Sequence, residues 1–515
     1  MFDHCDPAAS QDGQTMARLV HTLTRHGVSF LALPSGQSAV WTATHIEGFT
    51  HGLSGRRSPG ASQSRGLASV SLMKGVRLRP HRRFGTTVLG VVLAMTSMAT
   101  LSPAGAAPAT PARGCLWFGP AHSEGRFNVA FPDTGATYWT ATMTVPVGAI
   151  LTFEGQFPKA RYMSFNAYDD QGRATSSLPD ALIVPDRGST NPFRVGGSRT
   201  TVRRNYSVNV IPRSPTRPMP HNTIEAGTGR QILFYRVYLP DRGTGLTGGV
   251  GLPGATLHLA DGSVLRGPAA CRAVGASRSA PPSQTFPRAT YDALRSQAGR
   301  PSTFPAQDPA VFHRAFTLSS LVGCIYRSTC GGRPTLAPGQ YSNLDSAYAV
   351  AMVSRAFRAG PVLVLTGTMP TTPATGPKVA TMPKSAQLRY WSICQNESLA
   401  TTRVASCLPD DAVPLGRGRR YTIVSSTPAA RPSNAIRRCG VAWLAWPAAG
   451  DGAGHVADGL LIVRNMLPAA SFHQSIQSVP RPGSERSVMG QFLPTGRYTT
   501  TSAFEDRGCH RHVAG

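Results

Sequence analysis

The chain has 515 residues, and its 52 Lys and Arg residues outnumber its 25 Asp and Glu residues, which gives a net charge of +27 at neutral pH. Such an excess attracts anionic polymers, among them wall teichoic chains, acidic glycans and lipid headgroups. The alternative is a scattered, solvated surface, because no cluster of five or more Lys or Arg residues occurs. The sequence also lacks a basic stripe interleaved with stacking aromatic residues, which argues against nucleic-acid binding.

Residues 73–106 have the features of a secretory signal peptide. Basic residues follow Met73, an apolar stretch spans residues 86–101, and the small residues 104–106 offer a cleavage site. The apolar stretch has 16 residues, fewer than the roughly 20 that a membrane-spanning helix needs. We therefore expect a secreted or cell-envelope protein, with no stable membrane span unless the signal stays uncut as an anchor.

Residues 1–72 precede this signal and show no sustained helical or strand period, so we expect a disordered extension. A signal peptide behind 72 such residues is awkward for export, and the preferred interpretation places the true start near Met73. The alternative is a cytoplasmic extension ahead of an uncut anchor. Residues 1–106 hold 10 of the basic and 4 of the acidic residues, so a chain cleaved after residue 106 carries +21.

The rest of the sequence contains a duplicated β-rich unit. The order of its segments is kept, while the offset between the copies drifts between 210 and 230 residues, as loop insertions produce. The matching segments are 138–139 and 348–350, 149–153 and 361–365, 161–165 and 389–393, 178–180 and 408–410, and 204–208 and 419–423. Internal repetition of this kind indicates a repeated architecture, so we expect the same fold twice.

The first copy, residues 115–271, is predicted to form many short strands. Residues 137–145 alternate polar and apolar side chains, which is the pattern of a half-buried strand. Residues 257–265 predict a hairpin around Asp261 and Gly262. Further strands are predicted at 150–154, 162–168 and 232–239. Short strands joined by Gly- and Pro-rich turns are typical of a sandwich or jelly roll.

Residues 272–307 form a Pro-, Ser- and Arg-rich linker with a short helix predicted at 291–297, and the second domain spans residues 308–510. A helix is predicted over 308–321, because Asp308 can cap its first turn and Pro309 fits that turn. Later segments predict a buried strand at 460–464, a helix at 469–479 and a closing strand at 491–501. The predicted fold class is all-β, with two tandem jelly-roll-like β-sandwich domains and a few short helices.

Eight cysteines remain once Cys5 is set aside with the N-terminal extension. An even count behind a signal peptide indicates four disulfides. Cys115 and Cys271 flank the first repeat and are expected to tie its ends together. In the second repeat the simplest pairing joins neighbours in sequence, namely Cys324 with Cys330, Cys394 with Cys407, and Cys439 with Cys509. No Cys-x-x-Cys pair occurs, which argues against zinc, so we expect no metal and no cofactor.

The sequence lacks the Gly-x-Ser-x-Gly, His-Glu-x-x-His and phosphate-binding loop motifs, and we assign no catalytic residue. Asp169 and Asp170, with Asp180 nearby, could bind calcium through oxygen ligands, although turn capping explains them better. Arg236 could bind an anionic ligand, or it could be an outward-facing residue of an aromatic strand.

Three weaker candidates remain. Glu154 and Asp169 could form a glycosidase carboxylate pair, although two acids in a β protein are ordinary. His510 and His512 could ligate a metal, but a frayed basic tail is the better interpretation. The strand aromatics are expected in the core rather than on a sugar-stacking platform; they are Trp139, Tyr162, Tyr390, Trp391, Trp443 and Trp446.

Three segments carry a resemblance: Phe157 to Phe165, Asn191 to Phe193, and Tyr235 to Gly243. Through them the chain resembles a group of uncharacterised secreted actinobacterial proteins over residues 115–510. Each repeat is also similar to the jelly-roll-like C-terminal module of a bacterial envelope family of unknown function. The resemblance implies a β-sandwich fold and an envelope location, and it implies no catalytic residue.

The sequence therefore leads to a non-catalytic, secreted or wall-associated protein that binds an anionic or carbohydrate component of the envelope. The first alternative is a secreted hydrolase acting on glycans, with carboxylates brought together where the two domains meet. The second alternative is a purely structural envelope component without a small ligand.

Overall fold

The computed structural model describes residues 114–121, 128–212, 220–227, 229–283, 285–332, 334–337, 339–374, 376 and 379–509. The predicted N-terminal extension (1–72), the predicted signal peptide (73–106) and the two terminal histidines, His510 and His512, lie outside the described residues.

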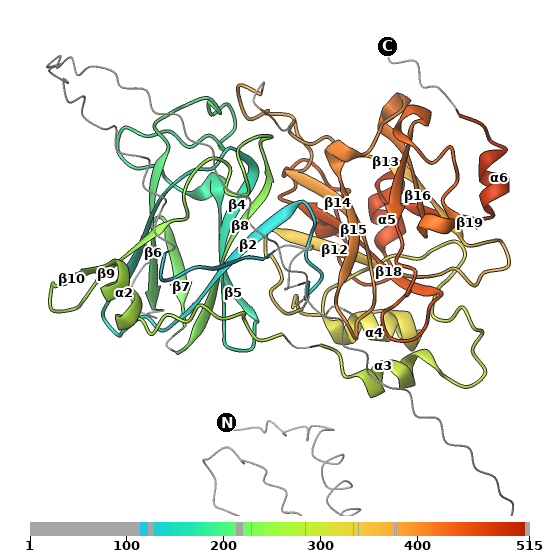
Figure 1. The fold of residues 1–515 in the computed structure, drawn as a ribbon, viewed down its shortest axis with the longest axis horizontal. Coiled ribbons are helices and arrows are strands. Elements are labelled where there is room, and N and C mark those ends of the chain that lie inside the picture. Colours follow the sequence, from blue (N-terminus) through green and yellow to red (C-terminus); the bar gives the residue numbers. More distant parts are fainter. Residues whose placement is uncertain are drawn as a thin grey trace, which may run out of the picture. The chain divides into compact units, whose positions relative to one another are not determined.

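The first half of the described chain forms two five-stranded sheets, coloured cyan to green in Figure 1. The first inner sheet has the strand order β1-β2-β8-β4-β5, and the first outer sheet has the order β10-β9-β3-β6-β7. Paired strands are antiparallel except β6 and β7, which are parallel. The strands are β1 (Phe118–Ala121), β2 (Ala136–Met143), β3 (Ile150–Gln156), β4 (Ala160–Tyr168), β5 (Ala174–Pro179), β6 (Asn205–Pro212), β7 (Thr223–Ala226), β8 (Gln231–Pro240), β9 (Gly254–His258) and β10 (Val264–Arg266).

The second half forms the second inner sheet, with the order β11-β12-β18-β14-β15, and the second outer sheet, with the order β17-β16-β13-β19. Again one pair, β16 and β17, is parallel. The strands are β11 (His313–Arg314), β12 (Ser346–Ser354), β13 (Val362–Thr368), β14 (Tyr390–Asn396), β15 (Val404–Pro409), β16 (Arg420–Ser426), β17 (Val441–Ala445), β18 (Asp458–Met466) and β19 (Thr495–Thr499).

The two halves have the same topology. The inner sheets agree strand for strand, and so do the outer sheets, apart from β10, which has no counterpart among the described strands. Each pair of matching sequence segments falls on equivalent strands. The all-β fold class is confirmed, and the duplicated strand order accounts for the repeated sequence.

Each inner sheet packs on its outer sheet around an apolar core. Successive side chains of a strand point to opposite faces of the sheet, so Phe165 and Tyr235 enter the first core while Tyr162 and Arg236 face the other way. Trp391 of the second core is completely buried. The expectation that the strand aromatics are core residues is confirmed for Trp139, Tyr162, Tyr390, Trp391 and Trp446, whereas Trp443 is half-buried.

The two inner sheets pack against each other through the faces that point away from these cores. Tyr162 and Tyr238 of the first inner sheet form one buried cluster with Tyr390 and Met466 of the second. The ring centroids of Tyr238 and Tyr390 lie 5.3 Å apart. The inner strands are therefore covered on both faces, and every residue of β4 and of β14 is buried.

Two buried ion pairs cross this interface in a reciprocal arrangement. Arg161 of β4 contacts Asp410, with 3.0 Å between Nη1 and Oδ1, and Arg389, just before β14, contacts Asp180, with 2.8 Å between Nη1 and Oδ1. Arg161 and Arg389 occupy matching positions of the two copies, as do Asp180 and Asp410. Each arginine thus reaches the aspartate of the other copy, which shows that a quasi-twofold relation connects the halves.

Four disulfides connect the cysteines in the pairs expected from the sequence. They are Cys115–Cys271, Cys324–Cys330, Cys394–Cys407 and Cys439–Cys509.

The helices are short. The α-helices are α2 (Gly267–Ala273), α3 (Arg288–Arg295), α4 (Leu318–Tyr326), α5 (Glu485–Met489) and α6 (Thr501–Glu505), and the 3-10 helices are η1 (Asp180–Leu182), η2 (Asp410–Ala412), η3 (Arg417–Arg419), η4 (Pro428–Ala430), η5 (Arg437–Cys439), η6 (Ile476–Ser478) and η7 (Gly490–Phe492). Among the described residues, none of the helices has both the length and the apolar character needed to cross a membrane.

The helix predicted over 308–321 is wrong. His313 and Arg314 form β11 and pair with β12, and α4 begins only at Leu318. The pairing with β12 keeps residues 313 and 314 extended, and a capping box then starts α4: the hydroxyl of Thr317 accepts a hydrogen bond from the backbone N–H of Ser320, and the hydroxyl of Ser320 accepts one from the backbone N–H of Thr317.

The helix predicted over 469–479 is also wrong, since only the single turn η6 forms there. Phe472, Ile476 and Val479 are nevertheless buried in the second core. The spacing of these residues predicted correctly which side chains are buried, but the backbone that carries them is not helical. The side-chain oxygen of Asn465 accepts a hydrogen bond of 2.9 Å from the backbone N–H of Ile476, which holds this segment in an irregular path.

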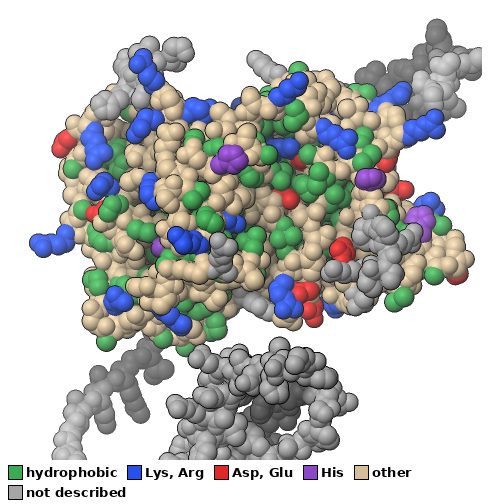
Figure 2. Space-filling view, turned by 180° about the vertical axis from the view of Figure 1, so that it is seen from behind, with side chains coloured by type: hydrophobic (Ala, Val, Ile, Leu, Met, Phe, Trp, Pro, Cys, Tyr) green, Lys and Arg blue, Asp and Glu red, His purple; other side chains and the backbone are tan. Residues whose placement is uncertain are grey.

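The positive charge is spread over the visible surface. In Figure 2, Lys and Arg side chains are distributed over the whole face shown and do not gather into one patch.

Candidate functional site

A pocket of about 230 Å³ lies between the facing surfaces of the two inner sheets. An engineered cavity of about 150 Å³ is large enough to hold benzene, so this pocket can hold a somewhat larger molecule. Leu318, at the start of α4, lines the pocket and is 42% exposed. The pocket therefore reaches the surface beside α4.

The pocket wall is mainly aromatic and aliphatic, and it contains two buried arginines. Arg236 comes from β8 and Arg464 from β18, which are equivalent strands of the two copies. Other residues that line it include Tyr138, Phe234, Tyr238, Tyr348, Leu460 and Ile462. The described residues lining the pocket include no Asp or Glu.

Arg236 is 2% exposed, and its guanidinium forms no ion pair with any described residue. Nη1 donates a short hydrogen bond to the side-chain oxygen of Asn166, and Nη2 donates one of 2.7 Å to the carbonyl oxygen of Tyr341. Nε has no hydrogen-bond partner, and within the described part of the chain no carboxylate oxygen lies within 4.0 Å of the guanidinium. A guanidinium stays protonated in proteins, so a positive charge remains in the pocket wall.

Aromatic rings partly stabilise this charge. The central carbon of the guanidinium lies 4.9 Å from the ring centroid of Phe234 and 5.6 Å from those of Tyr138 and Tyr168. Cation–π contacts of this kind contribute about 0.5–2 kcal/mol each, much less than the cost of burying an uncompensated ion. Arg236 is thus held in place but remains able to accept an anion.

Arg464, at the position equivalent to Arg236, has a carboxylate that compensates its charge. Its Nη2 donates to the carbonyl oxygen of Phe131, which corresponds to Tyr341, and its Nη1 lies 3.6 Å from Oδ2 of Asp133. Burial lowers the pKa of Arg464, but the Asp133 carboxylate and the neighbouring tyrosines together outweigh burial and leave the pKa raised.

Asn343 occupies in the second copy the place that Asp133 has in the first. The backbone N–H of each donates a 3.0 Å hydrogen bond to the hydroxyl of a tyrosine five residues later, Tyr138 or Tyr348. Because the residue facing Arg236 is a neutral amide, Arg236 lacks the carboxylate that Arg464 has. This replacement makes the surroundings of the two arginines unequal.

The charge of the Asp345 carboxyl group does reach Arg236, although the two residues form no ion pair. Burial raises the pKa of Asp345, while hydrogen bonds from the hydroxyls of Tyr162 and Ser177 act in the opposite direction. Its oxygen is therefore already engaged by these two hydroxyls, and it forms no ion pair with Arg236.

The structure separates the three ligand-binding residues predicted from the sequence. Arg236 lines the pocket, whereas Asp169 and Asp170 lie in the turn between β4 and β5. Asp169 accepts hydrogen bonds from the backbone N–H groups of Gln171 and Arg173 and forms an ion pair of 2.7 Å with the side chain of Arg173. It caps the turn, and neither aspartate belongs to a group of metal-ligating side chains among the described residues.

Glu154, the other half of the predicted carboxylate pair, is exposed on β3 of the first outer sheet. Asp169 belongs to the turn of the first inner sheet, and neither residue lines the pocket. The described residues that line the pocket therefore provide no glycosidase-like pair of acids.

Sequence reasoning missed Arg464, Asp133 and Asn343. A signal for them was present: the segments around Arg236 and Arg464 each place one arginine in a strand that is otherwise mainly apolar and aromatic, and the two strands are equivalent. Aligning these two strands would have paired the arginines and drawn attention to the residues that face them.

Two groups of side chains among the described residues could in principle hold a metal ion, but contacts within the protein account for both. Asp451 lies with His455 and Asp458, but its carboxylate accepts hydrogen bonds from the backbone N–H groups of Ala453 and His455 and from the hydroxyl of Tyr291. Asp133 lies near Cys394 and Cys407, which are joined in a disulfide.

No family model and no curated protein matches the chain. An uncharacterised protein from Burkholderia cenocepacia is similar in structure, with 12% identity, coverage of 76% of this chain and 83% of that one, and a TM-score of 0.42. The VPA0106 protein from Vibrio parahaemolyticus has 10% identity, 73% and 92% coverage, and a TM-score of 0.35. These likenesses are too distant to support an argument about fold or function.

Proposed function

We propose that this chain is an exported, non-catalytic binding protein whose pocket takes a small anionic amphiphile. The anionic head, a carboxylate or a group of similar chemistry, contacts Arg236, and the apolar body lies among the aromatic and aliphatic side chains of the inner sheets. One observation carries the proposal: Arg236 is a buried cation in an apolar pocket, with a free Nε and no carboxylate within 4.0 Å.

The physical reason is the cost of a buried, unpaired charge. Placing an ion in an apolar environment is unfavourable unless an opposite charge or hydrogen bonds compensate it. A ligand with one negative charge supplies this compensation, and its apolar part gains free energy by leaving water. The pocket therefore selects for both properties in one molecule.

Export is supported by the four disulfides, because structural disulfides form and persist in oxidising compartments. The sequence predicted an anionic or carbohydrate envelope component as the ligand. A mainly apolar pocket of about 230 Å³ suits a small amphiphile better than a polymer. A glycan hydrolase is less well supported, because the described lining of the pocket contains no carboxylate.

The test is a calorimetric titration of the full chain with three probes of equal chain length: octanoate, octanol and octylamine. A hydrogen bond to a charged group contributes about 1.5–3 kcal/mol, so we expect octanoate to bind about 10- to 150-fold more tightly than octanol. Octylamine should not bind. Equal affinities of the native protein for octanoate and octanol would refute the proposal.

The quasi-symmetry supplies a matched variant. Asn343→Asp is nearly isosteric and gives Arg236 the partner that Arg464 already has, so octanoate should lose its advantage over octanol. Leu318→Trp, at the exposed mouth of the pocket, should weaken all binding without altering the fold. If octanoate binds Asn343→Asp and wild type equally well, Arg236 is not the anion site. If no probe binds the native protein, the structural alternative is favoured.

A further inference from the structure

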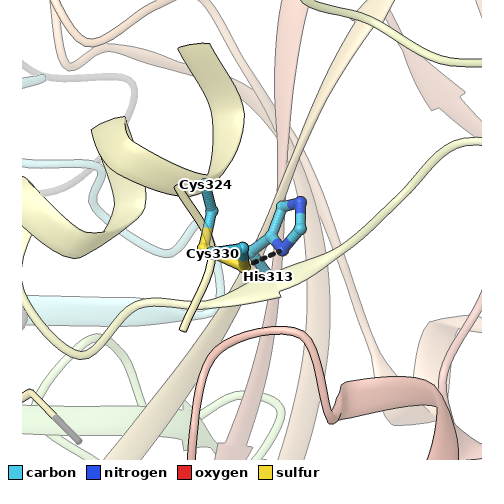
Figure 3. Close-up of side chains that lie close together, drawn as sticks. All are labelled: His313, Cys324 and Cys330. Atoms are coloured by element: carbon cyan, nitrogen blue, oxygen red, sulfur yellow. Dashed lines mark hydrogen bonds between the residues drawn. A yellow bond between two sulfur atoms is a disulfide. The ribbon is translucent and has the colours of Figure 1, made fainter. Parts of the chain in front are cut away.

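The side chains of His313, Cys324 and Cys330 form a group whose ligand atoms lie within 4.8 Å of one another (Figure 3). His313 belongs to β11, Cys324 to α4, and Cys330 to the segment that follows α4. Cys324 and Cys330 are joined in a disulfide, and Nδ1 of His313 lies 3.6 Å from Sγ of Cys330. None of these residues lines the pocket between the inner sheets.

We propose that reduction of the Cys324–Cys330 disulfide by a dithiol converts His313, Cys324 and Cys330 into a binding site for a thiophilic divalent cation such as Zn²⁺. In the reduction, the dithiol gives two electrons and two protons to the S–S bond, which breaks into two thiols, and the dithiol becomes a disulfide. Metal binding then releases both thiol protons, because the cysteines bind as thiolates.

The geometry suits a tetrahedral ion. With Zn–S bonds of about 2.3 Å and Zn–N bonds of about 2.0 Å, neighbouring ligands lie about 3.5–3.8 Å apart. The present 3.6 Å between Nδ1 of His313 and Sγ of Cys330 already matches this spacing. The two sulfur atoms must separate from a bond of about 2.0 Å to about 3.8 Å, and Sγ of Cys324, which lies within 4.8 Å of a ring nitrogen of His313, must keep a similar spacing to the imidazole.

The surrounding structure allows this movement. His313 is fixed by the pairing of β11 with β12, and Cys324 by the capped helix α4, whereas Cys330 is exposed and lies outside helices and strands. Burial lowers the pKa of His313, although the Glu485 carboxylate acts in the opposite direction, and this shift favours the neutral imidazole that binds a metal. A Cys₂His set leaves one position for water.

The same disulfide is the one whose loss disturbs the protein least. It closes a separation of only 6 residues, against 13, 70 and 156 for the other three. In the chain-entropy model the stabilisation by a disulfide grows with the length of the closed loop. Its exposed sulfur, Cys330, is open to attack by a thiolate.

The experiment treats the native full chain with limiting dithiothreitol without oxygen, labels free thiols with iodoacetamide, and maps them by mass spectrometry. Cys324 and Cys330 should be labelled before the other disulfide cysteines. A parallel unlabelled sample is titrated with Co²⁺ and followed by thiolate-to-cobalt absorption. We expect one Co²⁺ per reduced chain and none per oxidised chain.

His313→Gln should weaken Co²⁺ binding by at least about 10-fold, whereas His473→Gln, at an exposed position, should leave it unchanged. The double variant Cys324→Ser, Cys330→Ser should bind no Co²⁺ and keep the fold. Three results would each overturn the proposal: reduction of all disulfides together, a selectively reduced chain that binds no Co²⁺, or wild-type affinity in His313→Gln.

Discussion

Replacing Arg161 by methionine removes one half of a buried ion pair and leaves the other half, Asp410, in place. The side chains of Arg161 and Asp410 are 0% and 3% exposed, and Nη1 lies 3.0 and 3.1 Å from the two carboxylate oxygens. At an effective dielectric constant of about 20, charges at this distance attract each other by about 5 kcal/mol. In Arg161→Met the Asp410 carboxylate keeps the hydrogen bond from the backbone N–H of Trp391 but loses its counter-ion.

We therefore expect Arg161→Met to lower the free energy of unfolding by about 3–5 kcal/mol. The assay is urea denaturation followed by tryptophan fluorescence. Burial already raises the pKa of Asp410, and Arg161 holds it down, so the variant should take up a proton more readily. Its deficit should consequently be smaller at pH 5 than at pH 8.

Two controls separate the buried pair from a general effect of removing an arginine. Arg173→Ala, which breaks the exposed pair with Asp169, should leave the free energy of unfolding almost unchanged. The double variant Arg161→Met, Asp410→Asn carries no uncompensated charge and should recover most of the lost stability. The reasoning is refuted if Arg161→Met is no more harmful than Arg173→Ala, or if the double variant is as unstable as the single one.

Further predictions concern pH, disulfides and close packing. Burial raises the pKa of Asp180 to about 6 although Arg389 lowers it. A carboxyl group whose pKa is raised by folding stabilises the folded state only while it is protonated. The free energy of unfolding should therefore fall by about 3 kcal/mol as the pH rises from about 4 to 6. Asp180→Asn should reduce this pH dependence in urea titrations. In the chain-entropy model, removing the Cys115–Cys271 disulfide should lower the free energy of unfolding by about 5 kcal/mol, and removing Cys324–Cys330 by about 2 kcal/mol. Denaturation of the two double Cys→Ser variants measures both losses. Equal losses would contradict the model. Gly155→Ala should cost about 1–3 kcal/mol, because the new Cβ would stand 2.7 Å from the hydroxyl oxygen of Tyr206, whereas Gly254→Ala meets only one atom, at 3.9 Å, and thermal unfolding should show little change.

The strands and disulfides could be predicted because their signals are local. Alternation in residues 137–145 marks a strand whatever it packs against, and Cys115 and Cys271 visibly bracket one copy of the repeat. The start of α4 could not be chosen in the same way, since both Asp308 and Thr317 can cap a helix. The helix begins after Thr317 because residues 313 and 314 pair with β12, and this pairing is a long-range contact.

The pocket was harder to predict because it depends on how the two copies meet. Arg236 was recognised as a candidate, but the same strand pattern fits an arginine that points to solvent. Whether it is exposed or buried is decided by the packing of the second inner sheet on the first, and nothing within β8 encodes that packing.

The quasi-symmetry explains why a duplicated fold can bind one ligand in one orientation. Equivalent strands place Arg236 and Arg464 in the same pocket wall, and a perfectly repeated sequence would treat both charges alike. Asp133 forms an ion pair with Arg464, whereas Asn343, at the equivalent position, is neutral, so among the described residues Arg236 has no ion pair and the two arginines have different surroundings. Two reciprocal ion pairs hold the halves together in spite of this difference. They join Arg161 with Asp410 and Arg389 with Asp180. The interface thus retains its symmetry where stability depends on it and loses it where an anion is expected to bind.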